Sequence, residues 1–327
     1  MRSALGEALE PTRDQWIIQG HIGSTWQDGQ YVRTRELNHV RPAFEDLLAR
    51  LRTDHVELGM IHYVDACDEF RAIMDGPFIE YVRELLAAGK IGHIGLSTHN
   101  PEVALLACDE PEIEVIMFSL NPAFDMLPPS EDINTLFVEE YQQGLSNIDP
   151  KRQELHRLCS LNNVGLTVMK AFAGGRLLDA GKSPFGVAMT PTQCIEYCLS
   201  RPAVASVMTG FRNIEECDGC LKYVTATPEE RDFTHALAAA PTHAYFGQCI
   251  YCGHCQPCAV GINIAEVNKF YDLAVMHEEV PESVRKHYEA LDVTAGEGPG
   301  CQTCEENCPF GVKIAERMEK AAELFGF

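Results

Sequence analysis

The sequence predicts an α/β fold, in which a parallel sheet is covered by helices and a small cysteine-rich, α-rich segment follows. Three observations predict it. Short apolar runs alternate with amphipathic stretches from residue 16 to about residue 210, which is the pattern of strands and helices in a parallel sheet. Each run ends in polar or small residues. Seven of the 14 cysteines fall in two tight clusters near the C-terminus.

We expect six strands, because each apolar run has the length of a strand and is bounded by polar or turn-forming residues. The runs are residues 16–20, 56–62, 91–97, 115–120, 164–170 and 205–210. In a (β/α)8 barrel the C-terminal ends of the strands form the rim on which active sites are built. The polar residues that end these runs therefore indicate where the chemistry lies.

Between the runs, apolar residues recur at helical spacing. The expected helices are residues 44–51, 78–88, 150–161 and 192–199. The composition changes after residue 223, with a helix that opens at Thr227 and fades by Pro241. We expect one domain over residues 1–240 and a second over residues 241–327, with helices at 264–276, 282–291 and 314–325. So short a segment has little core of its own, and bound metal would stabilise it.

Charge and hydropathy exclude several classes of protein. The 327 residues carry a formal net charge of -22, which repels nucleic acids and anionic membranes and attracts a basic redox partner protein. No apolar run is long enough to span a membrane, and the N-terminus has no apolar signal core. We expect a cytoplasmic protein with a small-molecule substrate. The sequence leaves open whether the chain forms a homo-oligomer.

The cysteine clusters are the most specific signal in the chain. Cys249, Cys252, Cys255 and Cys258 are each separated by two residues, and Cys301, Cys304 and Cys308 end in Cys-Pro. Consecutive thiolates at this spacing hold an iron–sulfur cluster, and a remote Cys-Pro completes the other cluster in two-cluster ferredoxins. Zinc is the alternative, although zinc ribbons use separated pairs of cysteines.

Crossed ligation predicts two sets of ligands. One [4Fe–4S] cluster would be held by Cys249, Cys252, Cys255 and Cys308, and a second by Cys258, Cys301 and Cys304. The second set is one thiolate short, because Gly298 stands where the pattern requires a cysteine. A three-iron cluster, a ligand other than cysteine, and no second cluster remain open.

Three segments resemble the aldo-keto reductase family, in the branch fused to a ferredoxin-type module. They are residues 50–62, residues 89–100 and residues 168–178, together with the cysteine tail. The resemblance implies a TIM barrel, an active-site histidine at His62, and Ser97 and Asn100 near the nicotinamide amide of NAD(P)H. It also implies that Gly210 and Arg212 contact the phosphates of the dinucleotide.

The chain departs from this family pattern in three places. Residues 2–9 resemble the helix that follows the catalytic tyrosine, so two strands and the family's Asp and Tyr are missing. His21 stands where the family has its catalytic lysine, and Gly219-Cys220 stands where it has Glu-Asn. We expect a barrel that lacks its first two strands in this chain. Met1 would then be an internal start, with roughly 50–70 further residues upstream, unless a partner chain or a swapped copy fills the gap.

Three residue types at the strand ends carry the expected chemistry. His21 and His62 end adjacent strands and are the catalytic candidates, because a neutral imidazole donates to a carbonyl oxygen and an imidazolium delivers a proton. Asp65 either orients an imidazole or caps the next segment. Lys170 binds a phosphate or pairs with a carboxylate.

These observations predict an iron–sulfur oxidoreductase of aldo-keto reductase type, which reduces a carbonyl or an activated double bond with one-electron transfer through the C-terminal cluster. NAD(P)H needs no cluster, since it delivers both electrons together, and a flavin remains open although the chain shows no flavin motif. The alternative is a non-catalytic electron-transfer or partner-binding subunit with a degenerate barrel. The missing Tyr and Lys favour that alternative, and the polar rim opposes it.

Overall fold

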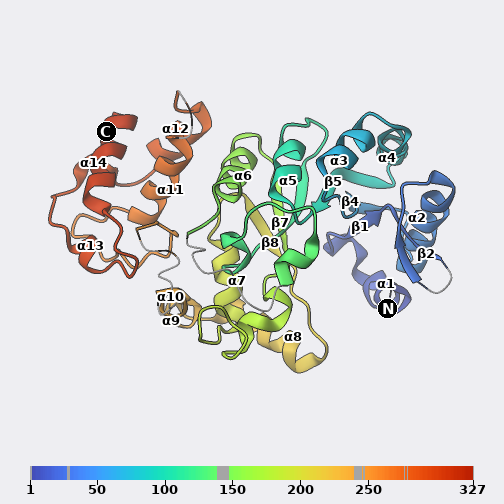
Figure 1. Ribbon diagram of the computed structural model, residues 1–327, viewed down its shortest axis with the longest axis horizontal. Coiled ribbons are helices and arrows are strands. Elements are labelled where there is room, and N and C mark those ends of the chain that lie inside the picture. The colour runs from blue at the N-terminus through green and yellow to red at the C-terminus, as the bar shows by residue number, and fades with distance from the viewer. Residues whose placement is uncertain are drawn as a thin grey trace. The chain divides into compact units, whose positions relative to one another are not determined.

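The computed structural model describes residues 2–27, 30–137, 147–238, 245, 247–275, 277 and 279–326 (Figure 1). The chain divides into two compact units. The first comprises Met1–Ser119, Pro129–Thr135 and Asn162–Thr167, and the second comprises Leu120–Pro128, Leu136–Leu161 and Val168–Phe327. Within the described residues, no helix is both long and apolar enough to cross a membrane.

Six strands form one parallel sheet, as the sequence predicts. In sheet order they are β1 (Gln19–Ile22), β4 (Val56–Ile61), β5 (Ile91–Thr98), β6 (Val115–Ser119), β7 (Gly165–Met169) and β8 (Val204–Val207). This order is the order along the chain, which is what repeated strand–helix units produce. In the first unit the register pairs His21 with Met60 and Gly59 with Ile94.

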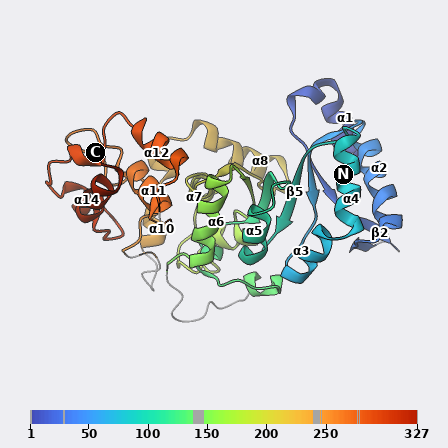
Figure 2. The ribbon, with the colours of Figure 1, turned by 90° about the horizontal axis from the view of Figure 1, so that it is seen from above.

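The described part of the first unit has six complete helical segments. They are α1 (Arg2–Leu9), η1 (Glu10–Gln15), α2 (Leu37–Leu51), α3 (Cys67–Met74), α4 (Pro77–Ala87) and α5 (Pro101–Cys108). Of these, α2, α4 and α5 contact strands of the sheet. The helix α2 contacts β1, and α4 contacts β5 (Figure 2). Gly6 permits the close approach of α1 to α2, because a Cβ atom at this position would lie 2.3 Å from the carbonyl oxygen of Arg50.

The prediction of the first strand was wrong at its start. That strand begins at Gln19 rather than at residue 16 and continues to Ile22. Trp16 and Ile17 are apolar but 49% and 77% exposed, so their apolar character does not reflect a place in the sheet. A two-stranded antiparallel hairpin, β2 (Ser24–Gln27) with β3 (Gln30–Arg33), follows β1 and was not predicted.

The second unit is largely helical. Its elements are η2 (Phe124–Met126), α6 (Pro150–Leu161), η4 (Ala173–Leu178), α7 (Pro191–Leu199), α8 (Ile214–Leu221), η5 (Lys222–Thr225), α9 (Pro228–Arg231), α10 (Thr234–Ala238), α11 (Ile264–Ala274), α12 (Glu282–Glu289), η6 (Ala295–Glu297), α13 (Thr303–Glu306) and α14 (Ile314–Phe325), and η3 (Ile133–Phe137) begins in the first unit and ends in the second. The helices α6 and α14 have the predicted bounds. The helices α11 and α12 end two residues before the predicted ends, and residue 276 lies outside the described residues.

Candidate functional site

His21 and His62 lie together in the first unit. His21 belongs to β1, and His62 follows the last residue of β4. Their imidazole rings are stacked, with ring centroids 4.2 Å apart and planes 21° apart. The backbone N–H of His62 donates to the carbonyl of Ile22 at 2.8 Å, so the parallel pairing of the two strands holds the rings at this distance.

Burial keeps both rings neutral. It lowers the pKa of His21 to about 4 and that of His62 to about 3, and neighbouring positive charges act in the same direction. An imidazolium at either position is therefore rare near neutral pH. Of the two roles expected from the sequence, hydrogen bonding by a neutral imidazole fits this environment.

The hairpin supplies polar groups that the sequence reasoning missed. The Ser24 hydroxyl is hydrogen-bonded to Nδ1 of His62. The Tyr31 ring meets the His62 ring nearly edge-on, with centroids 5.9 Å apart. Arg35, two residues after the end of the hairpin, donates to the carbonyl oxygens of His62 at 2.8 Å and Tyr63 at 3.1 Å. The Asp-Gly pair at residues 28–29, a strong signal for a two-residue hairpin turn, is the signal that could have found this element.

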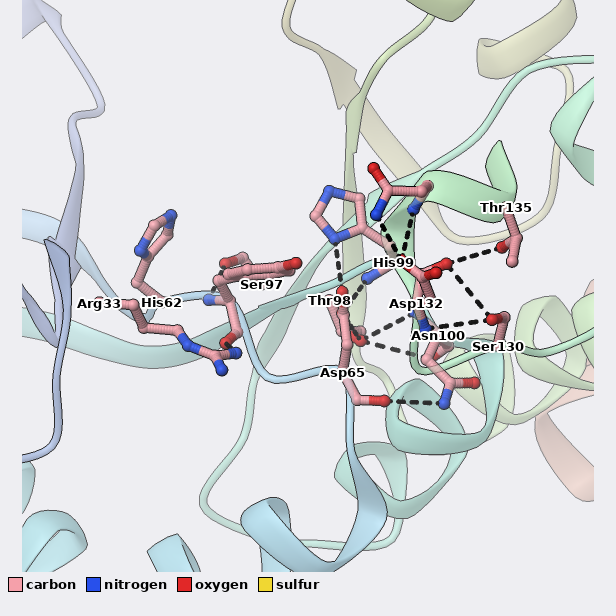
Figure 3. Close-up of polar contacts among 12 residues, drawn as sticks. Arg33, His62, Asp65, Ser97, Thr98, His99, Asn100, Ser130, Asp132 and Thr135 are labelled. Carbon is pink, nitrogen blue, oxygen red and sulfur yellow. Dashed lines mark hydrogen bonds and ion pairs between the residues drawn. The ribbon is translucent and has the colours of Figure 1, made fainter. Parts of the chain in front are cut away.

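Asp65 orients His99 rather than His62. One carboxylate oxygen accepts from the Thr98 hydroxyl at 3.0 Å and from the His99 backbone N–H at 2.7 Å. The other lies 3.0 Å from Nδ1 of His99. Figure 3 draws Asp65 beside His99 and Thr98 at this strand end. The orienting role expected for Asp65 therefore falls on an imidazole that the sequence reasoning did not consider.

The candidate nicotinamide residues Ser97 and Asn100 are buried at the end of β5. The Ser97 hydroxyl accepts from the backbone N–H of Tyr63 at 2.8 Å. The Asn100 side chain donates to the carbonyl of Asp65 at 2.9 Å and accepts from the backbone N–H of Glu102 at 3.0 Å, which caps α5 (Figure 3). These bonds hold the strand end, and a contact with nicotinamide remains a prediction.

In the second unit Lys170, Gly210 and Arg212 line one cavity of about 800 Å³ at the ends of β7 and β8. Arg176 and Lys182 line it as well, with Asp179 and Glu216 as the two carboxylates. The walls therefore carry four basic and two acidic side chains, in a chain that is strongly acidic as a whole. Positive clefts of this kind attract phosphate groups. Arg212 is ion-paired with Glu216 at 2.5 Å.

The cysteine clusters line two further cavities of the second unit. Cys249, Cys252, Cys255 and Cys308 surround a small cavity whose walls include Phe310 and other apolar side chains. Cys258, Cys301 and Cys304 line another, of about 350 Å³, which Gly298 also borders. Each of these two cavities is thus lined by one of the two sets of cysteine ligands that crossed ligation predicts.

The first set fits an iron–sulfur cluster in its donor chemistry. Burial, followed by the charges of Cys249, Cys252 and Cys308, raises the pKa of the Cys255 thiol to about 12. Because a cluster is held by thiolates, its binding would displace this proton. In the described part of the chain, no group of three or more His, Cys, Asp or Glu side chains is arranged so that it could hold a metal ion. A cluster at these cysteines therefore stays a prediction.

Residues 2–190 match the sequence profile of the aldo/keto reductase family. The chain belongs to the aldo/keto reductase family. This confirms the prediction of an oxidoreductase of aldo-keto reductase type, a type that acts on small molecules. The profile match ends before the cysteine clusters.

Among the known proteins that are similar to this family member are two from the genus Bacillus. The uncharacterized oxidoreductase YqkF of Bacillus subtilis (strain 168) is 27% identical over 224 residues, which cover 65% of this chain and 69% of that protein. The solved structure of aldo-keto reductase AKR11C1 from Bacillus halodurans in its holo form has a TM-score of 0.54 at 22% identity, covering 74% of this chain and 78% of that one. Its apo form has a TM-score of 0.50 at 21% identity, covering 74% and 77%. The structural likeness shows the fold.

Proposed function

We propose that this family member reduces a carbonyl or an activated double bond of a small molecule at the His21–His62 pair and carries a [4Fe–4S] cluster in a ferredoxin-type domain, residues 241–327. The observation that carries the proposal is the stacking of two neutral imidazoles beside Ser24 and Tyr31. Reduction of a carbonyl places negative charge on its oxygen, and a positioned N–H or O–H donor stabilises that charge.

Ser24 determines which nitrogen of His62 carries the proton. When the hydroxyl donates to Nδ1, the ring proton resides on Nε2, and this N–H can donate to the oxygen of the substrate. The stacked His21 ring restricts the orientation of His62. Tyr31 adds a phenol O–H beside the pair.

The cavity around Lys170, Gly210 and Arg212 is the proposed site for the phosphates of NAD(P)H. Its four basic side chains and its location after β7 and β8 support this assignment. The turn at Gly174 and Gly175 has positive φ at both residues, 68° and 92°, so no Cβ atom restricts the approach of a ligand to this backbone. Ser97 and Asn100 remain the proposed neighbours of the nicotinamide amide.

The cluster would be held by Cys249, Cys252, Cys255 and Cys308, and their shared apolar cavity supports this set. A bound cluster supplies one-electron transfer, which a nicotinamide cofactor alone does not. Cys258, Cys301 and Cys304 are the proposed ligands of a second, less firmly held cluster. The acidic surface favours a basic redox partner protein.

A non-catalytic electron-transfer or partner-binding subunit is the second candidate, favoured because Gln19-Gly20-His21 offers no lysine at the strand end where the family resemblance leads us to expect one. Turnover of NAD(P)H by anaerobically purified protein with a panel of aldehydes, quinones and enones, beside cluster reduction by dithionite, separates the two. We expect turnover with at least one substrate class and its loss in His62→Asn. Reduction of the cluster by dithionite without any turnover would favour the subunit.

A further inference from the structure

The second unit contains another cavity, of about 410 Å³, whose wall includes Cys249, one of the proposed cluster ligands, beside polar side chains that the proposed reduction does not use. The helix α6 contributes His156 and Arg157 to its wall, α14 contributes Arg317, and Arg201 follows α7. Three of its side chains are thus guanidinium groups. Asp272 of α11 is the carboxylate on its wall.

Arg201 has unsatisfied donors in this wall. The residue is 3% exposed, and its guanidinium lies over the Tyr197 ring, 4.2 Å from the centroid. Its Nε and Nη2 atoms have no hydrogen-bond partner among the described residues. Burial lowers the pKa of Arg201, but nearby acidic groups, Tyr197 and Asp125 foremost, outweigh this effect and raise it, so its charge is compensated. The two donor nitrogens nevertheless have no acceptor, which is costly, and an acceptor brought by a ligand would stabilise this arrangement.

The other two arginines, Arg317 and Arg157, differ in how much uncompensated positive charge they bring to the cavity wall. Arg317 is ion-paired with Asp272 at 2.5 Å, which neutralises both. Arg157 bonds through its terminal nitrogens to His277 at 2.8 Å and Glu154 at 3.5 Å, and its Nε has no partner in the described part of the chain. The wall therefore has a surplus of positive charge, and Arg201 and Arg157 hold its unsatisfied donors.

His156 adds an acceptor to this set. The residue is 5% exposed, and its Nδ1 lies 3.0 Å from the carbonyl oxygen of Pro202. A carbonyl only accepts, so Nδ1 carries the proton and Nε2 presents a lone pair. Burial lowers the pKa of this ring to about 4, which keeps it neutral near pH 7. Nε2 has no partner among the described residues.

We propose that this cavity binds a small organic anion that carries a hydroxyl group. Its carboxylate or phosphate oxygens accept from Arg201 and Arg157, and its hydroxyl donates to Nε2 of His156. A planar guanidinium suits either kind of anionic group. The site belongs to the second unit alone, and it requires neither NAD(P)H nor an iron–sulfur cluster.

Isothermal titration calorimetry of the anaerobically purified full chain at pH 7 tests the site with malate, succinate and inorganic phosphate as probes. We expect saturable binding of malate at one site. Succinate, which lacks the hydroxyl, should bind less tightly because Nε2 of His156 is left unpaired. Phosphate binding in preference to malate would identify the natural group as a phosphate, and the reverse as a carboxylate.

Two variants and one control locate the binding. Arg201→Met keeps the length of the side chain without its charge, and we expect it to weaken binding by roughly tenfold or more. Arg157→Gln, a change at a less buried position, should weaken binding as well and serves if Arg201→Met fails to fold. Lys286→Gln removes an exposed charge in the same unit, outside the cavity, and should bind as the wild type does. Absence of binding by all three probes, or unchanged affinity in whichever arginine variants fold, would overturn the proposal.

Discussion

The imidazole of His62 is stacked on that of His21 and hydrogen-bonded to Ser24. The stacking restricts the plane of the His62 ring. The hydrogen bond to Ser24 determines whether Nδ1 donates or accepts. Because the rings belong to adjacent parallel strands, their relation is set by backbone hydrogen bonds rather than by flexible loops. Groups held on rigid strands keep the orientation that proton and hydride chemistry requires.

The first prediction concerns His62. Replacement by asparagine should lower kcat by roughly 10²–10⁴-fold, which is the usual contribution of a positioned acid–base group, with less change in KM. His93→Asn, at an exposed histidine on β5 paired with Glu114, is the matched control and should leave kcat unchanged. Equal kcat values in wild type and His62→Asn would remove His62 from the chemistry.

The second prediction follows from buried neutral histidines. His156 is protonated below pH 6.5 when the chain is unfolded, but its folded pKa is about 4. The unfolded state therefore binds more protons in this window, and stability falls as pH decreases from 6.5 toward 4. Between pH 7 and pH 5 the loss from this residue should be about 2 kcal/mol.

Urea unfolding of wild type and His156→Gln at both pH values measures this loss. The variant should be less stable at pH 7, because it alters the bond to Pro202, but it should lose less stability on acidification. Lys286→Gln, which removes an exposed side chain that does not titrate between these pH values, should keep the pH dependence of the wild type. An identical pH dependence in wild type and His156→Gln would show that His156 is already charged in the folded protein.

Much of the fold follows from hydrophobic periodicity. The six strands and the bounds of α6 and α14 are predicted because apolar residues recur at intervals of two or of three to four along those segments. The start of β1 could not be predicted, because Trp16 and Ile17 are apolar and yet exposed. The sequence pattern shows which residues are apolar. It does not show which of these residues are buried by tertiary contacts.

The site was predictable only in part, for a similar reason. His21 and His62 are found from strand ends, and parallel pairing brings strand ends together. Tyr31 reaches His62 through a hairpin, and Asp65 bonds to His99, 34 positions away in the sequence. The hydrogen-bond partner of Asp65 depends on how these segments pack in three dimensions. The spacing of residues in the sequence does not determine this packing.

The third prediction concerns the cysteines. Anaerobically prepared protein should contain one firmly bound [4Fe–4S] cluster, because four thiols line one cavity, and at most one labile cluster, because three line the other. Cys308→Ser should lose the firm cluster, whereas Cys304→Ser should affect only the labile one. Cys67→Ser, in the first unit, is the control. Iron and sulfide analysis with EPR of the reduced protein provides the measurement.

Two results would contradict the cysteine assignment. Two equally stable four-iron clusters would require a ligand outside the seven cysteines. Stoichiometric zinc in place of iron would make these cysteines structural ligands and leave the domain without a redox role.

The last prediction concerns the cavity at the ends of β7 and β8. Arg212 donates to Glu216 through Nε at 2.9 Å and Nη2 at 2.5 Å, so this carboxylate competes with a phosphate for the guanidinium. Arg212→Gln should weaken NADPH binding by roughly tenfold, and Glu216→Gln should tighten it by a few-fold, because the competing acceptor loses its charge. Glu215→Gln is the control, because it removes the same charge from the preceding residue of α8, which does not line the cavity.

Fluorescence titration with NADPH at low and high salt measures the affinity of these three variants. Higher salt should reduce the differences between them because it screens exposed charges. Equal affinities in Glu216→Gln and Glu215→Gln would show that the gain reflects net charge alone, and an unchanged affinity in Arg212→Gln would show that Arg212 does not contact the dinucleotide.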